Sequence, residues 1–390
     1  MSKLEKLIQQ YCPDGVEYKA LGKVTIMKRG TSATKGIMQA GNIPVISGGR
    51  QPAFYCNASN RTGEVITVAG SGAGAGYVQY WNEPIFVCDA FSIQGNETLN
   101  TKYVYYVLTS IQEKIYSTKK GGGVPHVHIS SIDKFEIPLP PLPVQEEIVR
   151  VLDAFTELQA ELQAELQAEL QKRKQQYNFY RDNLLNFKDI NRGGQEIKWM
   201  KLKDVATVYD GTHQTPAYKE SGIPFISVEN IGNIYNSRKY ISREDFDKYK
   251  IKPQKGDVFM TRIGSIGVCA VFEKQADIAY YVSLALIRPD HNAVNSRYLK
   301  HIIESLTGCK ELRKRTLINA VPIKVNKDDI GKIVLPFPSL TEQQKIVDIL
   351  DRFDTLTNDL TSGLPAEMEK RRQQYEFYRD KLLTFKRKEA

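Results

Sequence analysis

A leucine repeat in the middle of the chain predicts one long helix. Residues 157–171 read ELQAELQAELQAELQ, a polar stretch with leucine at every fourth position and no glycine, proline or β-branched residue. All of its residue types favour the helix. Because an α-helix repeats every 3.6 residues, a spacing of four turns the leucine stripe by about 40° at each step. The pattern fits either a solvated amphipathic linker or a helix that winds around a partner helix.

A second copy of this segment favours the partner helix. Residues 137–187 align with residues 335–385 without a gap and are identical at 26 of the 51 positions. The apolar track is retained, whereas the Glu, Gln and Ala residues between its leucines mostly differ. Two long helices that pack on each other require apolar tracks of equal length. The residues predicted to pair are Leu158, Leu162, Leu166, Leu170, Leu356, Leu360, Leu364 and Met368.

The segments before the two helices predict two globular domains. VEYKALGKV (16–24) and IKWMKLKDV (197–205) open them in the same way. Short apolar runs separated by glycine and asparagine follow in each half, together with one segment of helical spacing. Pro365 should kink or break the second long helix. We expect a mixed α/β fold with a pseudo-twofold internal repeat: β-rich domains at 1–140 and 191–338, and long helices at 141–190 and 339–390.

The charge of the chain favours an anionic partner. Its 390 residues include 54 Lys and Arg against 45 Asp and Glu, a net charge of +9, which points first to nucleic acid. No apolar run approaches the roughly 20 residues that span a bilayer, and the N-terminal segment lacks the apolar core of a signal peptide. We therefore expect a cytoplasmic protein without a membrane partner. The five cysteines form no CxxC pair, so we expect reduced thiols rather than a zinc site or disulfides.

The chain lacks residues that a DNA-modifying enzyme needs. It contains neither Asn-Pro-Pro-Tyr nor Asp-Pro-Pro-Tyr, the tetrapeptides of amino-methyltransferase active sites. The glycines of AGSGAGAG (69–76) fit neither GxGxxG nor GxxxxGK[ST], so we interpret this stretch as a loop or hairpin tip whose amides can meet DNA phosphate. His126 and His128 have no neighbouring Cys, Asp or Glu to complete a metal site. We expect no catalytic residue, no cofactor and no metal.

The repeated motifs resemble those of a known family. IPLPPLPVQEEIVRVLDAF recurs as LPFPSLTEQQKIVDILDRF, and each copy leads into QQYxFYRDxLL. This arrangement resembles the specificity (S) subunits of type I restriction–modification systems over essentially the whole chain. DGTHQTP (210–216), GIPFISVENI (222–231) and GDVFMTRIGSIG (256–267) are similar to recurrent segments of their target-recognition domains, and GNIPVISGG (41–49) and GEVITVAGSG (63–72) are looser counterparts.

The resemblance implies a subunit that performs no catalysis itself. Two target-recognition domains would each read one half of a bipartite site in double-stranded DNA. The two long helices would pair antiparallel as a coiled coil, hold the domains apart and dock two methyltransferase (M) subunits, and restriction/translocation (R) subunits would join the complex. The ELQA tract would set the spacing, because each tetrad lengthens a helix by about 6 Å and rotates it by about 40°.

Candidate DNA-binding residues follow from residue type and position in loops. Phosphates attract Lys and Arg, whereas base edges are read by Arg, Asn, Gln, Ser and Thr. The candidates in the first domain are Lys28, Arg29, Thr31, Ser47, Arg50, Ser71, Lys119 and Lys120. Those in the second domain are Thr212, His213, Gln214, Thr215, Asn230, Arg262 and Ser265. We interpret Tyr177, Phe179, Tyr180 and Leu184 of the QQYNFYRD block as helix or partner contacts rather than base-stacking residues.

Two other functions fit parts of the pattern. A coiled-coil adaptor with two protein-binding domains would show the same repeat and have no DNA preference. A self-contained DNA methyltransferase would need active-site motifs other than those sought above.

Overall fold

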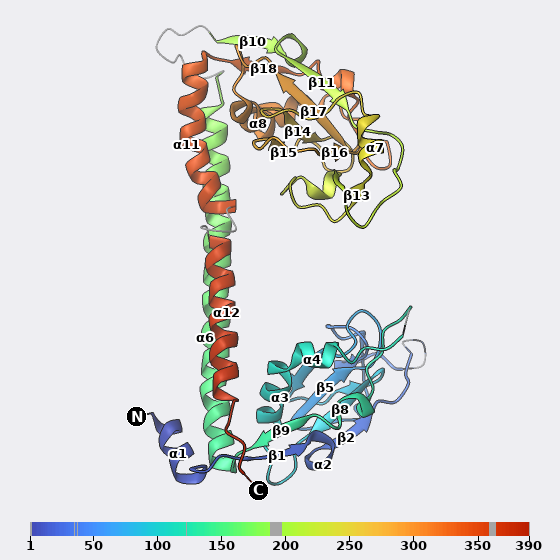
Figure 1. Ribbon diagram of the computed structural model, residues 1–390, viewed down its shortest axis with the longest axis vertical. Coiled ribbons are helices and arrows are strands. Elements are labelled where there is room, and N and C mark those ends of the chain that lie inside the picture. Colours follow the sequence, from blue (N-terminus) through green and yellow to red (C-terminus); the bar gives the residue numbers. More distant parts are fainter. Residues whose placement is uncertain are drawn as a thin grey trace. The chain divides into compact units, whose positions relative to one another are not determined.

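The chain forms two compact units. The computed structural model describes residues 2–34, 36, 38–121, 123–187, 197–358 and 364–389. One unit consists of Met1–Glu165 with Glu367–Ala390, and the other consists of Leu166–Ala366. In each unit a β-rich domain packs against parts of the long helices (Figure 1). The mixed α/β class and the twofold repeat of the domain are therefore confirmed.

The first domain contains three small sheets and several short helices. Its strands are β1 (Glu17–Ala20), β2 (Ile26–Arg29), β3 (Ile43–Ile46), β4 (Phe54–Cys56), β5 (Val65–Ala69), β6 (Val78–Trp81), β7 (Phe86–Val87), β8 (Ala90–Gln94) and β9 (Glu136–Leu139). Its helices are α1 (Lys3–Tyr11), α2 (Leu21–Val24), α3 (Thr101–Ser110), α4 (Gln112–Tyr116) and α5 (Ile129–Ile132). The sheets have the orders β1-β9, β2-β8-β5-β6 and β4-β3-β7, and only the β3–β7 pairing is parallel.

The second domain repeats this topology strand for strand. Its strands are β10 (Lys198–Lys201), β11 (Ala206–Asp210), β12 (Ile223–Ile226), β13 (Tyr240–Ile241), β14 (Val258–Thr261), β15 (Cys269–Val271), β16 (Ala279–Tyr280), β17 (Leu284–Pro289) and β18 (Val334–Phe337). Its helices are the 3-10 turns η1 (Leu202–Asp204) and η2 (Val228–Asn230), and α7 (Arg243–Asp247), α8 (Ser296–Glu304), α9 (Leu306–Arg313) and α10 (Lys327–Ile330). The orders β10-β18, β11-β17-β14-β15 and β13-β12-β16 match those of the first domain, and the parallel pair β12–β16 matches β3–β7.

The central strands explain why hydrophobic clusters lie on both faces of the main sheet in each domain. Every residue of β5 and of β14 is buried. Since successive side chains of a strand point to opposite faces, Ile66 and Val68 join the cluster under α3, whereas Val65 joins a smaller cluster with β7. In β14, Val258 and Met260 likewise face α8, and Phe259 faces the opposite cluster. The continuous apolar sequences of β5 and β14 are thus explained by burial of both faces of each strand.

The long helices complete the cores of both domains. Helix α6 spans Leu142–Leu184, α11 spans Leu340–Asn358 and α12 spans Leu364–Leu382. Ile148, near the start of α6, lies in the core of the first domain with Leu383, just beyond the end of α12. Ile346, near the start of α11, lies in the core of the second domain with Leu185, just beyond the end of α6. Each core therefore takes residues from the start of one long helix and the end of another.

The C-terminal segment, expected as a long helix over 339–390 with a kink or break at Pro365, contains two described helices. The structure describes α11 and α12, and residues 359–363 between them lie outside the described residues. Pro365 is the second residue of α12, where a proline is tolerated because its missing N–H would have no acceptor within the helix. After α12 the chain extends along the start of the first domain, since Val16 N donates to Lys386 O at 2.9 Å and Lys388 N donates to Val16 O at 2.9 Å.

Aromatic contacts show how the helices pack within each unit. In the first unit, Thr156 of α6 hydrogen-bonds Tyr375 of α12 (2.8 Å between the hydroxyl oxygens), and Phe155 contacts Tyr378 (6.5 Å between ring centroids). The earlier residue of α6 contacts the later residue of α12, so the two helices pack antiparallel here. In the second unit, Tyr180 of α6 stacks on Phe353 of α11 (5.3 Å between ring centroids). Position 353 corresponds to 155 and position 180 to 378, so the contact is duplicated.

The leucine stripe contributes less to this packing than expected. Leu158 is 62% exposed, because it lies on the side of α6 away from Thr156. Each later leucine is turned by about 40° toward the contact. The half-buried members of the predicted set are Leu162, Leu166, Leu170, Leu364 and Met368. Leu360 and the side chain of Leu356 lie outside the described residues.

A buried glutamine explains the Gln that follows each proline cluster. The Gln145 amide donates to Pro140 O (2.6 Å) and Thr98 O (3.2 Å) and accepts from Asn100 N (2.9 Å). Gln343 repeats the pattern with Pro338 O, Ala293 O and Asn295 N, each at 2.9 Å. Both side chains are almost completely buried. They satisfy backbone groups where a helix begins against its domain.

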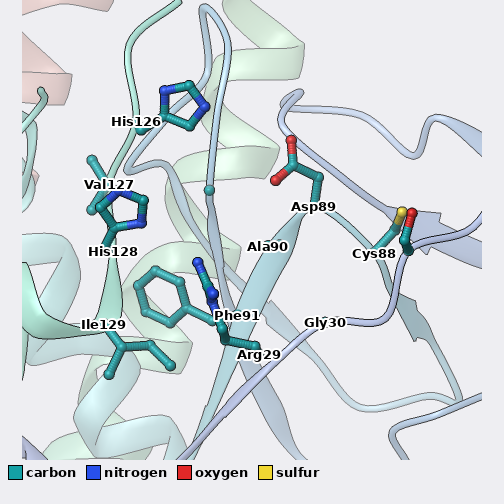
Figure 2. Close-up of a pocket in the computed structure, with 12 residues that line it drawn as sticks. Arg29, Gly30, Cys88, Asp89, Ala90, Phe91, His126, Val127, His128 and Ile129 are labelled. Carbon is teal, nitrogen blue, oxygen red and sulfur yellow. The ribbon is translucent and has the colours of Figure 1, made fainter. Parts of the chain in front are cut away.

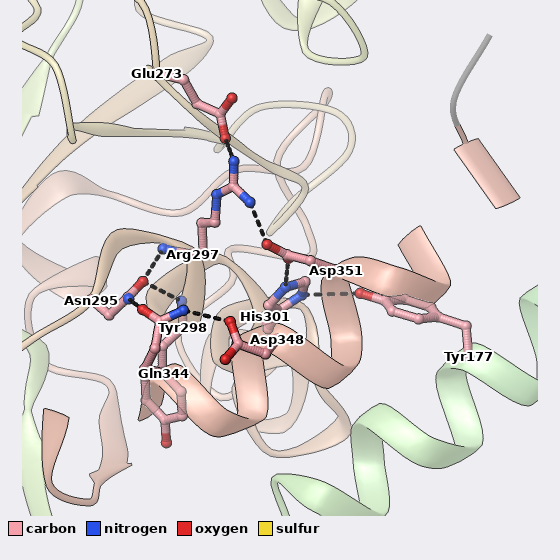
Figure 3. A network of polar contacts seen from close by, with 9 residues as sticks. All are labelled: Tyr177, Glu273, Asn295, Arg297, Tyr298, His301, Gln344, Asp348 and Asp351. Atoms are coloured by element: carbon pink, nitrogen blue, oxygen red, sulfur yellow. Dashed lines mark hydrogen bonds and ion pairs between the residues drawn. The ribbon is translucent and has the colours of Figure 1, made fainter. Parts of the chain in front are cut away.

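A second duplicated network joins the long helices to α3 and α8. In the second unit, Asp351 of α11 pairs with Arg297 and with His301, whose other ring nitrogen lies 3.0 Å from the Tyr177 hydroxyl (Figure 3). Burial alone would raise the pKa of Asp351, but hydrogen bonds from His301 and Arg297 outweigh it and hold the pKa below its ordinary value. In the first unit, Asp153 occupies the corresponding place and pairs with Lys102 (2.7 Å). The predicted structural role of Tyr177 agrees with this contact.

Candidate nucleic-acid interface

Three loops of the first domain meet beside the end of β5. They are residues 47–53, the glycine-rich stretch 70–77, and residues 117–121 with 123–128. Backbone bridges join Ser71 and Lys120 to opposite sides of His126. Gly48 packs so closely on this junction that a Cβ there would lie 2.3 Å from the Ser71 carbonyl oxygen. The close approach requires glycine, and it gathers residues that are distant in the sequence.

These loops bring several candidates of the first domain together. Ser47, Arg50, Ser71, Lys119 and Lys120 all lie in them.

Two of these cations lie over aromatic rings. The Arg50 guanidinium lies 5.0 Å from the Tyr77 ring centroid, and the Lys119 ammonium lies 4.1 Å from that of Tyr116. Burial raises the pKa of the Tyr116 phenol, and the nearby Arg50 charge opposes the rise. Both cations are thus held near one protein face by cation–π contacts.

The remaining candidates of the first domain follow its edge strand β2. Lys28 and Arg29 are exposed at the end of the strand, and Thr31 comes after Gly30. Arg29 lines a pocket of about 460 Å³ together with Asp89, His126 and His128 (Figure 2).

Sequence reasoning did not select the other polar residues of this pocket. Asp89 has no motif around it, and the two histidines were considered only as metal ligands. Over the described ranges no group of three His, Cys, Asp or Glu side chains is arranged to hold a metal ion. What identifies these residues is their position, Asp89 just before β8 and the histidines in the loop beside it, and this position is known only from the fold.

Four candidates of the second domain lie in one exposed loop after β11. Thr212 occupies the place that Thr31 occupies after β2, and its hydroxyl accepts a hydrogen bond from Gln214 N (3.2 Å). His213 and Thr215 complete the set. The loop borders a pocket of about 480 Å³, whose other side carries Lys248 and Lys250. Exposed hydroxyl, amide and ammonium groups here suit phosphate and base contacts.

Arg262 and Asn230 are engaged within the domain instead. The Arg262 side chain is 8% exposed, its Nη1 pairs with Asp210 Oδ1 at 2.7 Å, and its Nε donates to Val282 O at 2.9 Å. The amide of Asn230 donates to Asn236 O (3.2 Å) and accepts from Ser227 N (3.0 Å). Residue type suggested base contacts at both positions. The Arg262 guanidinium is instead used by a distant residue, Asp210, and the Asn230 amide by its own local turn.

The sequence analysis also named no candidate DNA-binding residue in an exposed apolar loop of the second domain. It corresponds to the loop that carries Lys119 and Lys120 in the first domain, because the Leu317–Lys324 bridge matches the Lys120–His126 bridge. Ile318 is 69% exposed and Val321 is 99% exposed. Apolar side chains beside a nucleic-acid face can contact thymine methyl groups or wedge between base steps. Ser265, also exposed, lies in the turn before β15.

Arg262→Ala should destabilise the second domain rather than remove a DNA contact. It would leave the partly buried Asp210 carboxylate without its cation, at a cost of about 1–3 kcal/mol given that Asp210 retains some solvent. Urea unfolding of the full chain should show this as a lower midpoint for the second domain. The control is His213→Ala. His213 lies 3.9 Å from the same carboxylate but is 70% exposed, so its removal should change the stability little. Unchanged stability with lost DNA binding would contradict this role.

Comparison with known proteins agrees with the duplicated architecture. Residues 13–172 and 195–370 match the family model described as the type I restriction modification DNA specificity domain. The putative type I restriction enzyme specificity subunit S.HindORF215P of Haemophilus influenzae is 32% identical, with 98% of each chain covered. The EcoR124I/EcoR124II specificity subunit of Escherichia coli is 30% identical, with 100% of this chain and 98% of the relative covered.

A solved structure shares the fold. It is a chain from work on the complex assembly and conformational transition of the type I R-M system. The TM-score is 0.64 at 18% identity, over 95% of this chain and 98% of that chain. In the described ranges of the present chain no helix is long and apolar enough to cross a membrane. With the twice-matched family model and two relatives aligned over nearly their full length, the chain belongs to the specificity subunits of type I restriction–modification systems.

Proposed function

We propose that this chain reads a bipartite DNA site for a type I restriction–modification complex and performs no catalysis itself. The domains at 1–140 and 191–338 would each read one half-site, and the helical segments at 141–190 and 339–390 would set the gap between them. The observation that carries the proposal is one strand order present twice, with different exposed side chains in corresponding loops. A constant framework with variable loops is what recognition of two unlike half-sites requires.

The charges support double-stranded DNA as the ligand. The chain has a net charge of +9. Four exposed cations of the first domain lie on the strand end and loops described above: Lys28, Arg29, Arg50 and Lys120. Cations that neutralise phosphates release counterions, which makes binding strongly dependent on salt. Bacterial DNA lies in the cytoplasm, and we place the protein there.

Duplicated exposed aromatic residues support two methyltransferase subunits as partners. Phe179 of α6 is 63% exposed, and Phe377 at the corresponding place of α12 is 62% exposed. Each contacts the next tyrosine edge-on, at 5.6 Å in the first case and 5.4 Å in the second. Large exposed aromatic side chains are typical anchors of protein interfaces. Two equivalent anchors fit two copies of one partner, and restriction subunits would join that complex.

Selection from a random DNA library tests the proposed function. The complex of this chain with its methyltransferase should enrich one split motif, with an affinity that falls as salt rises. The isolated chain should transfer no methyl group from S-adenosylmethionine. Methyl transfer by the isolated chain would contradict the non-catalytic role. Stable association with the methyltransferase without any enriched motif would favour the adaptor.

Phe179→Asp should remove one methyltransferase from the complex. A charge placed in an apolar anchor is desolvated without a partner, so binding at that site should weaken by at least tenfold. Native mass spectrometry should then show one methyltransferase per chain, and none when Phe377→Asp is added. The matched control is Leu158→Asp, an equally exposed apolar residue of α6 outside the duplicated pair. Full assembly of the double variant would exclude these anchors.

Deletion of one tetrad, residues 165–168, should shorten the gap and leave both half-sites unchanged. The helix would lose about 6 Å of rise and about 40° of rotation, and one domain would move along the duplex relative to the other. Insertion of one further ELQA tetrad should lengthen the gap. Sequencing of the enriched DNA measures both changes. Altered half-sites would show that the tract is part of the reading surface.

A further inference from the structure

The pocket beside β2 displays a donor and an acceptor side by side. Arg29 lies at the end of β2, and Asp89 immediately precedes the neighbouring strand β8. Both side chains face the pocket of about 460 Å³ (Figure 2). Within the described part of the chain the Arg29 guanidinium has no hydrogen bond or ion pair, and the Asp89 carboxylate accepts a hydrogen bond from the Ser71 hydroxyl. The pocket therefore offers a free cation opposite a carboxylate.

The pocket exists because Gly70 has no side chain. Gly70 N donates to Asp89 O, and Gly70 O accepts from Val127 N, each at 3.0 Å. In the second domain, Arg262 N donates to Ser283 O and Arg262 O accepts from Val325 N, again at 3.0 Å. The two positions are thus equivalent in the backbone framework. At Gly70 there is no side chain, whereas at the equivalent position Arg262 carries a long cationic side chain.

The second domain holds an ion pair at the place where the first domain exposes Arg29. The place of Arg29 at the end of β2 is taken by Asp210 at the end of β11, since both pair with the corresponding position of the sheet. Asp210 binds the Arg262 guanidinium at 2.7 Å. A mutual ion pair leaves neither group available to a ligand. In the first domain Arg29 and Asp89 are both exposed and do not pair with each other. Their charges are therefore available to a ligand.

The chemistry of the pair selects among the groups that DNA offers. A phosphate would be attracted by Arg29 and repelled by Asp89. A G·C base pair instead presents acceptors at guanine O6 and N7 next to the cytosine N4 donor in the major groove, and Arg and Asp are the side chains that bind these two edges. We propose that Arg29 and Asp89 form a G·C-reading subsite of the first domain. This subsite rests on the proposed function.

The test replaces each charge separately in the complex with the methyltransferase. Arg29→Gln should lower the preference for G·C at one position of one half-site by roughly tenfold or more, because a bidentate contact discriminates by about that much. Asp89→Asn should lower the preference at the same position, since its carboxylate accepts from cytosine N4. The other half-site should keep its sequence in both variants, which also shows that the complex has assembled.

Lys28→Gln is the matched control. Lys28 carries the same charge one residue earlier, and the alternation of a strand directs its side chain to the opposite face. This change should weaken binding to all sequences alike and reduce the salt dependence by about one phosphate contact.

Two outcomes would overturn the subsite. They are uniform weakening by Arg29→Gln, as expected of a phosphate contact, and unchanged base preferences in both Arg29→Gln and Asp89→Asn. If the wild-type complex enriched no split motif, the proposed function itself would fail.

Discussion

Neither globular domain completes its hydrophobic core from its own strands and short helices. The first core needs Ile148 from the start of α6 and Leu383 from beyond the end of α12, and the second needs Ile346 from α11 and Leu185 from beyond α6. Burial of such side chains contributes about 1.5–3 kcal/mol each. The long helices are thus parts of the domains rather than separate linkers. A helix anchored in this way can transmit a change of its length to the domain that it enters.

The same constraint explains which residues the duplication preserves. Gln145 and Gln343 satisfy backbone groups at the start of a helix, and Tyr103 and Tyr298 donate to the carbonyls of Pro138 and Pro336. These groups are buried, so their loss would leave polar atoms unpaired. The loops at the other end of each domain lack this constraint. There Gly70 corresponds to Arg262, so the first framework leaves a pocket beside Arg29 and Asp89, whereas the second fills that place with the Arg262–Asp210 ion pair.

The sequence predicts this architecture well because its signals are local and repeated. Period-four leucines, proline clusters and apolar runs identified the long helix and the two β-rich halves. The same local signals predicted that Leu158 pairs with the other helix, but Leu158 is exposed. Its exposure depends on which face of α6 meets Tyr375, and the local sequence does not show this. Among the site residues, Arg262 was selected for its guanidinium, but its partner Asp210 is 52 residues earlier. Asp89 was not selected, because only the sheet brings it beside Arg29. Pairing between distant residues decides which polar groups remain free, and residue type alone does not show it.

Reading of a split site by two unlike domains is the central claim of this account. Its most direct test is a single-molecule methylome of the source cells, recorded with and without the gene for this chain. The account predicts one split motif with methylated bases in both halves, which disappears when the gene is deleted and returns with it. A methylome that keeps the same motifs after deletion, in cells where the methyltransferase is expressed, would contradict the claim.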